Sequence, residues 1–553
     1  MTRRFPCIGA FALLGLVGVL GVVSGSSASP RPVAVWENAI EVPGIASLNR
    51  GGDAQVVSVS CATAGDCAAG GSYKRSGNSQ AFVVSEANGS WGNAIEVPGA
   101  ATLNSGGDAR VNSVSCATAG NCAAGGYYTE HSDPAQAFVV RETNGRWGRA
   151  IEVPGTSTLN SGGNARVNSV SCATAGNCAA VGSYLDGSGN PQAFVASETN
   201  GSWGSAIEVP GTATLNTGGD ARVNSVSCTT AGNCTAGGSY ADGVEVARHY
   251  QAFVVSETDG IWGSAIEVPG TATLNSDGYA SVLSVSCAKP GNCTAGGSYL
   301  DGSDHYQAFV ASETNGIWGN AIEVPGSATL NSGGLAGVNS VACATAGNCA
   351  AVGLYTDGSG NGQAFVVSET NGVWGSAIEV PGTATLNRGG FAEANSVSCA
   401  TAGNCAAGGL YRDRSTRWQG FVVSETNGSW GGAIERPGTA TLNRGGDASV
   451  NSVSCTTAGN CTAGGSYVNP SDRREGFVVS SSSSTSPCIV PKLIGETLGE
   501  AKKMLTAAGC TLGRRTTVYA SAKKGRVVAQ HPKHGTHLQP GGKVALTLSK
   551  GPK

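Results

Sequence analysis

The sequence predicts an all-β fold: an eight-bladed β-propeller closed by an N-terminal strand and followed by a small α+β domain. Three observations lead to this prediction. The segment Trp-x-x-Ala-Ile-Glu-x-Pro-Gly recurs at steps of 55 to 59 residues, and a period of this size is typical of propellers, solenoids and arrays. Each unit contains short strand-like segments between turns, with no helical periodicity. The first and last units are incomplete in complementary ways. The recurring tryptophans are Trp36, Trp91, Trp147, Trp203, Trp262, Trp318, Trp374 and Trp430.

One repeat reads as four strands. In the third unit these are Arg166–Cys172, Cys178–Tyr184, Gln192–Glu198 and Trp203–Val209. Asn200-Gly201 lies between the last two and is a strong signal for a tight hairpin. Four short strands joined by hairpins and repeated at this period predict one propeller blade.

The ends of the array predict how the ring closes. The first unit begins with an isolated fourth strand, Trp36–Val42, while the last unit has three strands and ends at Phe477–Ser480. Pairing the extra strand with the incomplete unit removes an exposed sheet edge. An open solenoid would not need complementary ends. We therefore expect one closed ring over residues 33–480, followed by a Ser-rich linker over 481–487.

The N-terminus predicts export. Arg3 and Arg4 precede the apolar run Ile8–Val23, and Ser26–Ala28 offers small residues for cleavage, so residues 1–28 read as a signal peptide. The alternative is an uncleaved anchor, but the apolar run is shorter than the roughly 20 residues that span a membrane.

Eighteen of the 19 cysteines lie beyond the signal, and sixteen of them form pairs with five residues between the partners. In an exported chain this spacing predicts local disulfides. A metal site is disfavoured because the six histidines do not accompany the pairs. The pairs are Cys61/Cys67, Cys116/Cys122, Cys172/Cys178, Cys228/Cys234, Cys287/Cys293, Cys343/Cys349, Cys399/Cys405 and Cys455/Cys461.

The charge is unevenly distributed. Residues 488–553 contain twelve Lys and Arg but only two acids, a net charge of +10, whereas the mature repeat region carries about −15. An acidic body argues against nucleic acid as a partner. The basic C-terminal segment favours an anionic surface or polymer.

The repeats resemble the secreted propeller-like repeats of actinobacteria, which share Ser-Val-Ser-Cys, a short turn and Cys-x-Ala-Gly-Gly. This resemblance implies a fold and export but no reaction. Ser197–Trp203 is similar to the Asp-box hairpin of sialidases, with a spacing that differs by one residue and Asn200 in place of an acid. No arginine triad for a carboxylated sugar stands out, so no sialidase activity is inferred.

A glutamate recurs in every fourth strand. It could form a ring of carboxylates for cations or for acid–base chemistry, but equivalent positions around a ring do not converge in one pocket. We expect a solvated outer face, where charge discourages edge pairing. The residues are Glu41, Glu96, Glu152, Glu208, Glu267, Glu323, Glu379 and Glu435.

The loops between second and third strands vary most among the repeats. His249-Tyr250, His305-Tyr306 and Trp418 depart from an otherwise uniform pattern. Loops on a rigid scaffold often carry function, so Tyr250, Tyr306 and Trp418 are candidate ligand-binding residues. Neutral drift on exposed loops is the alternative.

The C-terminal segment has a different pattern. Val490–Gly495, Ala508-Gly509, Gly525–Pro532 and Val544–Gly551 occur in the order typical of a PASTA domain, which residues 488–553 resemble over their full length. The resemblance implies one helix on a three-stranded sheet and binding to peptidoglycan or anionic wall polymers. Cys488 and Cys510 flank the first strand and helix and are expected to form a bridge. From charge alone, the candidate ligand-binding residues are Lys523, Lys524, Arg526 and Lys533.

The sequence thus predicts a secreted, cell-wall-associated binding protein, expected to be a monomer, with no catalytic residues, metal or cofactor. The propeller is interpreted as a ligand-binding or display scaffold, with a glycan or a protein as its ligand. Two alternatives remain open: a glycan-processing enzyme that the PASTA domain targets to the wall, and a protein-binding propeller.

Overall fold

The computed structural model describes residues 33–552 except 132–134, 244–248, 277, 436–437, 485–487 and 539–541. The predicted signal peptide, residues 1–28, lies outside the described residues. Within the described part of the chain, no helix is long and apolar enough to span a membrane.

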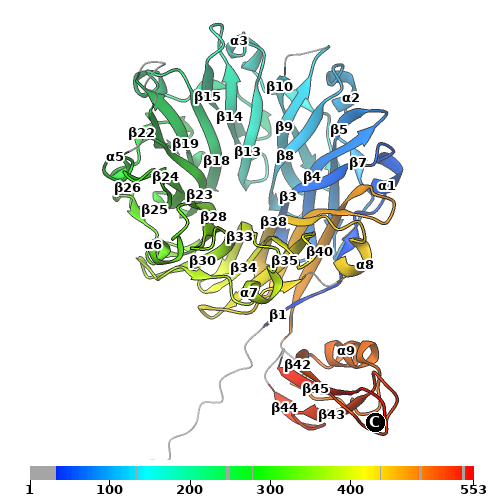
Figure 1. The fold of residues 1–553 in the computed structure, drawn as a ribbon. Helices are drawn as coiled ribbons and strands as arrows, with labels where there is room; N and C mark the ends of the chain where they lie inside the picture. The colour runs from blue at the N-terminus through cyan, green and yellow to red at the C-terminus, as the bar shows by residue number, and fades with distance from the viewer. Residues whose placement is uncertain are drawn as a thin grey trace, which may run out of the picture.

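Eight antiparallel sheets form the blades of a propeller (Figure 1). Blade 1 comprises β3 (Ala54–Thr63), β4 (Asp66–Arg75), β5 (Asn78–Ala87), β6 (Ser90–Trp91) and β7 (Ile95–Glu96). Blade 2 comprises β8 (Ala109–Thr118), β9 (Asn121–Thr129), β10 (Ala135–Thr143), β11 (Arg146–Trp147) and β12 (Ile151–Glu152). Blade 3 comprises β13 (Arg166–Thr174), β14 (Asn177–Leu185), β15 (Pro191–Thr199), β16 (Ser202–Trp203) and β17 (Ile207–Glu208). Blade 4 comprises β18 (Ala221–Thr230), β19 (Asn233–Asp242), β20 (His249–Thr258), β21 (Ile261–Trp262) and β22 (Ile266–Glu267).

The other blades repeat this order. Blade 5 comprises β23 (Ala280–Lys289), β24 (Asn292–Leu300), β25 (Tyr306–Thr314), β26 (Ile317–Trp318) and β27 (Ile322–Glu323). Blade 6 comprises β28 (Ala336–Thr345), β29 (Asn348–Thr356), β30 (Gly362–Thr370), β31 (Val373–Trp374) and β32 (Ile378–Glu379). Blade 7 comprises β33 (Ala392–Thr401), β34 (Asn404–Arg412), β35 (Trp418–Thr426), β36 (Ser429–Trp430) and β37 (Ile434–Glu435). Blade 8 comprises β38 (Ala448–Thr457), β39 (Asn460–Val468), β40 (Arg474–Ser484) and two N-terminal strands, β1 (Val33–Trp36) and β2 (Ile40–Glu41).

The N-terminal strands close the ring, as predicted. β1 pairs antiparallel with the end of β40, with Val33 opposite Ser484 and Trp36 opposite Ser481, and β2 pairs with the same strand through Phe477 and Val478. Two details differ from the expectation. The predicted strand Trp36–Val42 is split into β1 and β2, and residues 481–484, expected in the linker, form the end of β40. A serine run can extend this strand because β1 supplies its backbone partners.

A one-turn helix after the Pro-Gly of each Trp-x-x-Ala-Ile-Glu-x-Pro-Gly segment was not predicted. In every helix whose capping residue is described, a glycine with positive φ precedes the helix, such as Gly211 at 86° before Thr212–Leu215. This conformation suits glycine because it has no Cβ. Four residues are too few to show a helical period. The helices are α1 (Ile45–Leu48), α2 (Ala100–Leu103), α3 (Thr156–Leu159), α4 (Thr212–Leu215), α5 (Thr271–Leu274), α6 (Ser327–Leu330), α7 (Thr383–Leu386) and α8 (Thr439–Leu442).

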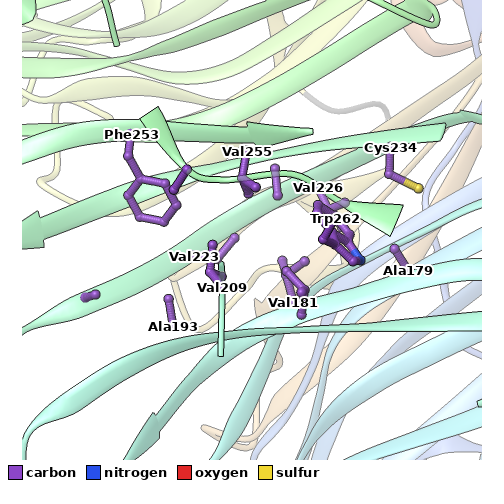
Figure 2. Packing of buried hydrophobic residues seen from close by; sticks show 14 of the residues in the cluster. Ala179, Val181, Ala193, Val209, Val223, Val226, Cys234, Phe253, Val255 and Trp262 are labelled. Atoms are coloured by element: carbon purple, nitrogen blue, oxygen red, sulfur yellow. The ribbon is translucent and has the colours of Figure 1, made fainter. Parts of the chain in front are cut away.

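The hydrophobic core lies between adjacent blades rather than within one. In Figure 2, Val223 and Val226 of blade 4 pack against Ala179 and Val181 of blade 3. Each fully buried valine contributes about 1.5–3 kcal/mol of hydrophobic stabilisation. A blade therefore depends on its neighbours, which explains why the ring must close.

The first strand of each blade packs beside the first strands of its neighbours, and we call these the inner strands. Serine side chains join adjacent inner strands, which explains the Ser-Val-Ser-Cys motif. Ser113 and Ser115 of blade 2 accept hydrogen bonds from the backbone N–H groups of Val170 (3.0 Å) and Cys172 (2.9 Å) in blade 3. At the closure, Ser452 and Ser454 accept from Val59 and Cys61 in the same way. The hydroxyls thus satisfy backbone donors that an inner strand would otherwise leave unpaired.

The C-terminal domain has its own core. β41 (Cys488–Ile489) pairs with β44 (His537–Leu538), while β42 (Thr511–Val518), β45 (Lys543–Ser549) and β43 (Val527–His531) form a three-stranded sheet in that order. α9 (Leu498–Ala507) begins with a capping box in which Thr497 and Glu500 bond to each other's backbone N–H groups. The buried residues of this domain are Cys488, Val490, Leu493, Ala501, Leu505, Cys510, Val527, Val544 and Leu546.

All eighteen cysteines beyond the predicted signal form the predicted disulfides. The ninth bridge joins Cys488 to Cys510, and the remaining cysteine, Cys7, lies outside the described residues. The other eight each close the turn between the first two strands of a blade. They join Cys61 to Cys67, Cys116 to Cys122, Cys172 to Cys178, Cys228 to Cys234, Cys287 to Cys293, Cys343 to Cys349, Cys399 to Cys405 and Cys455 to Cys461.

The burial of these bridges differs from what their place at a turn suggests. The first cysteine of each pair is partly exposed, but the second lies in the second strand, which neighbouring strands and blades cover, and is only 3% to 6% exposed. The second cysteines are therefore structural residues of the core. They are Cys67, Cys122, Cys178, Cys234, Cys293, Cys349, Cys405 and Cys461.

Candidate functional site

Two of the candidate aromatics come together on the loop side of blades 4 and 5. Tyr250 is the second residue of β20, after His249, and Tyr306 is the first residue of β25. Tyr279 lies between them, with ring centroids 5.8 Å from Tyr250 and 5.4 Å from Tyr306. All three rings are partly exposed. We call Tyr250, Tyr279 and Tyr306 the tyrosine cluster.

Trp418 belongs to a separate aromatic pair in blade 7. Its ring meets that of Phe391 edge to face at 5.4 Å, and the guanidinium of Arg412 lies 4.4 Å from the centre of the Trp418 rings. The structure therefore brings together two of the three candidate aromatics and places the third two blades away.

Sequence reasoning missed Tyr279 and Phe391 because they lie outside the loops that vary in length. Both occupy the position just before the inner strand, where most of the other repeats have Asp or Asn. The backbones of Tyr250 and Tyr279, and of Tyr306 and Leu335, form isolated parallel bridges between adjacent blades. Aligning the repeats at this position would have shown that blades 5, 6 and 7 carry Tyr, Leu and Phe there.

The opposite side of the ring, where the disulfide turns lie, has grooves between blades. One of about 600 Å³ lies between blades 4 and 5 and is lined by Glu257, Glu313 and Trp318. A smaller groove of about 250 Å³ follows between blades 5 and 6. The grooves recur because the blades recur, so they do not single out one pocket.

Buried glutamates of the third strands line these grooves. The Trp147 indole donates to Ser85 of the preceding blade (2.9 Å), and the Ser85 hydroxyl donates to Glu142 (2.6 Å). Glu142 is 1% exposed, and its Oε2 has no hydrogen-bond partner among the described residues. Burial raises the pKa of this carboxyl above its ordinary value. Equivalent relays join Trp262, Ser197 and Glu257, and Trp430, Ser368 and Glu425.

Seven of the eight fourth-strand glutamates are partly buried rather than fully solvated, which corrects the prediction for them, whereas Glu435 is exposed. Glu96 is partly buried and accepts a hydrogen bond from the hydroxyl of Tyr73 at 2.7 Å, while the preceding Ile95 is 41% exposed. The buried tyrosine needs an acceptor, and the glutamate supplies it. The same tyrosine-to-glutamate bond occurs at Tyr128–Glu152, Tyr184–Glu208, Tyr240–Glu267, Tyr299–Glu323 and Tyr467–Glu41.

In the C-terminal domain, the predicted basic residues lie in and after one loop. Lys523, Lys524 and Lys533 are exposed, whereas Arg526 donates to the carbonyl of Gly495 (2.9 Å) and lies 3.8 Å from Glu500. Arg526 thus supports the domain as well as contributing charge.

Two residues extend this basic surface beyond the prediction. Lys550 lies 5.4 Å from the ring centre of Tyr519, which is 58% exposed. The loop that carries Lys523 and Lys524 lies next to Lys550, because the backbone N–H of Gly525 donates to the carbonyl of the preceding residue, Ser549. We call Tyr519, Lys523, Lys524 and Lys550 the basic end.

Comparison with family profiles assigns the smaller domain, because residues 489–550 match the PASTA domain family. The C-terminal domain is a PASTA domain. A PASTA domain and nine disulfides fit an extracellular or cell-wall protein. Comparison with curated proteins gave no match.

Solved propellers are similar to the repeat region only at low identity. Sqt1 from Chaetomium thermophilum has a TM-score of 0.45 and 10% identity, covering 81% of this chain and 99% of Sqt1. Sqt1 bound to the N-terminus of ribosomal protein L10 has a TM-score of 0.44 and 11% identity, covering 81% of this chain and 100% of Sqt1. A Hadza microbial sialidase has a TM-score of 0.31 and 11% identity, covering 73% of each chain. At these TM-scores, no conclusion about the activity or ligand of the propeller follows.

Within the described residues, no group of His, Cys, Asp and Glu is arranged to hold a metal ion. The residues described above offer hydrogen bonds, charge and aromatic contacts on both surfaces.

Proposed function

We propose that this protein is secreted and binds the cell wall through its PASTA domain, while the propeller presents a ligand-binding surface and performs no reaction. The match of residues 489–550 to the PASTA family carries the proposal. The ligand class is peptidoglycan or an anionic wall polymer. The net charge of +10 on residues 488–553 would attract carboxylates and phosphates on such a surface.

The basic end supplies the chemistry that such a ligand needs. Lys523, Lys524 and Lys550 offer ammonium donors, and Tyr519 offers an exposed ring beside them. Exposed lysines interact with anions mainly through screened charge, so binding should weaken as salt increases.

The test is co-sedimentation of the full chain with purified bacterial cell walls. A variant with Lys523→Glu, Lys524→Glu and Lys550→Glu should leave most of the protein in the supernatant at physiological salt. The matched control reverses Arg388, Arg414 and Arg444 of the propeller, which keeps the change in net charge the same. Equal sedimentation of the two variants would show that the PASTA surface does not hold the protein to the wall.

A further inference from the structure

Three arginines occupy the same position on three adjacent inner strands. Arg110, Arg166 and Arg222 each open the segment Arg-Val-Asn-Ser-Val-Ser-Cys in blades 2, 3 and 4. The other five repeats have no arginine there; they carry Gln55, Ser281, Gly337, Glu393 and Ser449. In a chain whose blades are nearly identical, a change confined to three neighbouring blades marks one sector of the ring.

Contacts between the inner strands place these arginines side by side along the ring. The Asn112 side chain donates to the carbonyl of Val167 at 2.8 Å, and Asn168 donates to Val223 at the same distance. Arg166 and Arg222 directly precede the two valines. Blades 2, 3 and 4 are therefore linked at the residues next to the arginines.

An aromatic ring joins the first two arginines. The guanidinium of Arg166 lies 4.2 Å from the ring centre of Tyr127, which is the cross-strand partner of Arg110. The Tyr127 hydroxyl donates to Asp108 at 3.3 Å. The Nε of Arg110 is buried and has no hydrogen-bond partner within the described part of the chain. Arg110 as a whole is partly exposed, so its other guanidinium nitrogens remain the donors that it can offer to a ligand.

The third arginine, Arg222, is connected to the tyrosine cluster through Asp220. Arg222 contacts Asp220 through Nε at 3.0 Å, and its side chain is 54% exposed. Asp220 also accepts from the hydroxyl of Tyr250 at 3.2 Å. The arginines and the tyrosine cluster are therefore parts of one continuous surface over blades 2 to 5.

The arginines bring positive charge to one sector of an acidic body. Arg110, Arg166 and Arg222 add three positive charges to a propeller of about −15, and only Arg222 forms a salt bridge, with Asp220, among the described residues. A planar guanidinium binds a carboxylate through two parallel hydrogen bonds. Partly exposed tyrosine rings offer apolar faces with a polar edge, which suit the faces of sugar rings, and the two aspartates can accept from hydroxyls.

From this juxtaposition we propose that the propeller binds a carboxylate-bearing saccharide, with the acid group on Arg110 and Arg166 and the sugar rings along the tyrosine cluster. The proposal rests on the ligand-binding role proposed above for the propeller and names the ligand class. The PASTA domain takes no part in this site.

Calorimetric titration of the full chain at physiological salt tests the proposal. The probes are trigalacturonate and N-acetylglucosaminyl-N-acetylmuramate, each compared with its methyl ester, which removes only the charge. We expect saturable binding of at least one acid and at least tenfold weaker binding of its ester. Arg110→Ala and Arg166→Ala should each weaken binding of the acid about tenfold or more, and Tyr279→Ala should weaken binding of both the acid and its ester.

Matched variants separate this site from other charged surfaces. Arg146→Ala removes the same charge from an exposed position of blade 2 and should leave binding unchanged. The triple Lys→Glu variant of the basic end should also retain saccharide binding, while Arg166→Ala should retain sedimentation with cell walls. Failure of one proposal is thereby distinguishable from failure of the other. Melting curves of all variants should coincide, which excludes unfolding as the cause.

The proposal would be overturned by no saturable binding of either acid, by equal binding of acid and ester, or by equal weakening by Arg146→Ala. Binding of triglutamate as tight as that of the acidic sugars would also overturn it, because the site would then recognise acidic peptides.

Discussion

The buried carboxylates of the third strands make stability depend on pH. Glu86 is 6% exposed, and burial, with Asp66 and Glu37 nearby, raises its pKa to about 7. The folded state therefore holds a proton that the unfolded state releases near pH 4.5. The stabilisation from this neutral form is complete below that pH and is lost as pH rises through about 7. Burial raises the pKa of the six equivalent residues as well: Glu142, Glu198, Glu257, Glu313, Glu369 and Glu425.

Replacing Glu86 with Gln should reduce this dependence. At pH 8 the variant should be more stable than the parent by roughly 1–3 kcal/mol, because a neutral amide avoids the charged buried form. At pH 5 the two should melt at similar temperatures. Thermal unfolding between pH 5 and pH 8 measures both effects.

The control is Asp259→Asn, which removes a carboxylate from an exposed hairpin where most other blades have Asn. It should leave the pH dependence unchanged. A parent protein whose melting temperature rises steadily from pH 5 to pH 8 would contradict the role assigned to the buried glutamates.

The serines between inner strands should contribute measurably to stability. Ser115→Ala leaves the N–H of Cys172 without its acceptor, which should cost about 1–2 kcal/mol. Blade 6 offers the reverse experiment, since Ala342 occupies the position of the second serine. Ala342→Ser should raise the melting temperature by supplying an acceptor for Cys399. A lower melting temperature in both variants would show that packing, rather than the hydrogen bond, determines which residue is favoured at this position.

For single residues, the sequence predicted which residue types matter better than it predicted which residues they contact. The disulfide pairs were predictable because five residues separate the cysteines of each pair, but the burial of one cysteine in each pair depends on the neighbouring blade. The roles of Glu96 and Tyr279 were not predictable, because each depends on a residue brought near only by folding. The three arginines show the same limit, since their spacing of 56 residues is visible in the sequence but their adjacency is not.

The strands β1 and β2 are the elements on which closure depends. Trp36 and Ala39 belong to the core between blades 7 and 8, and the Tyr467 hydroxyl donates to Glu41. Deleting residues 33–43 should expose this core and the edge of β40. The expected result is a large fall in melting temperature or new oligomers formed by strand exchange, measured by thermal unfolding and light scattering.

A synthetic peptide of residues 33–43 should restore the monomer and much of the lost stability, whereas a scrambled peptide should not. A truncated protein that stays monomeric and equally stable would show that the ring does not need these strands.

The disulfides should be complete in the folded protein. Thiol titration after unfolding should find no free cysteine, and peptide mapping should recover the nine local pairs. Each bridge across a five-residue turn is worth roughly 2 kcal/mol in the chain-entropy model, so reduction should lower the melting temperature strongly. Bridges between blades, or bound zinc, would contradict the pairing.

Elements were predictable where they repeat and are long enough to show a pattern. The hairpin at Asn200-Gly201 was predictable because both residues adopt positive φ, at 50° and 83°. The one-turn helices were not, since a turn of helix and an irregular loop look alike over four residues. The end of β40 was missed because Ser481–Ser484 have low strand propensity, and pairing with β1 overrides it.

For the whole molecule, the two domains should behave differently toward the wall. Each has its own core, so the isolated residues 488–553 and 33–484 can be compared. The isolated PASTA domain should sediment with purified walls and lose binding as salt increases. The propeller, at about −15, should stay in solution unless the walls carry the acidic saccharide proposed as its ligand, which a soluble competitor would displace. Salt-independent sedimentation of the PASTA domain would exclude the electrostatic component.

The pairing of β1 with β40 also affects the order and the rate of folding. The two strands are separated by more than four hundred residues of chain, so the first strand to be synthesised cannot pair until the last blade is complete. Contacts so distant in sequence form slowly, because a long loop must close before they contribute. Until then, Trp36 and the edge of blade 8 remain available to other chains, and folding at high concentration should favour exchanged dimers over closed rings.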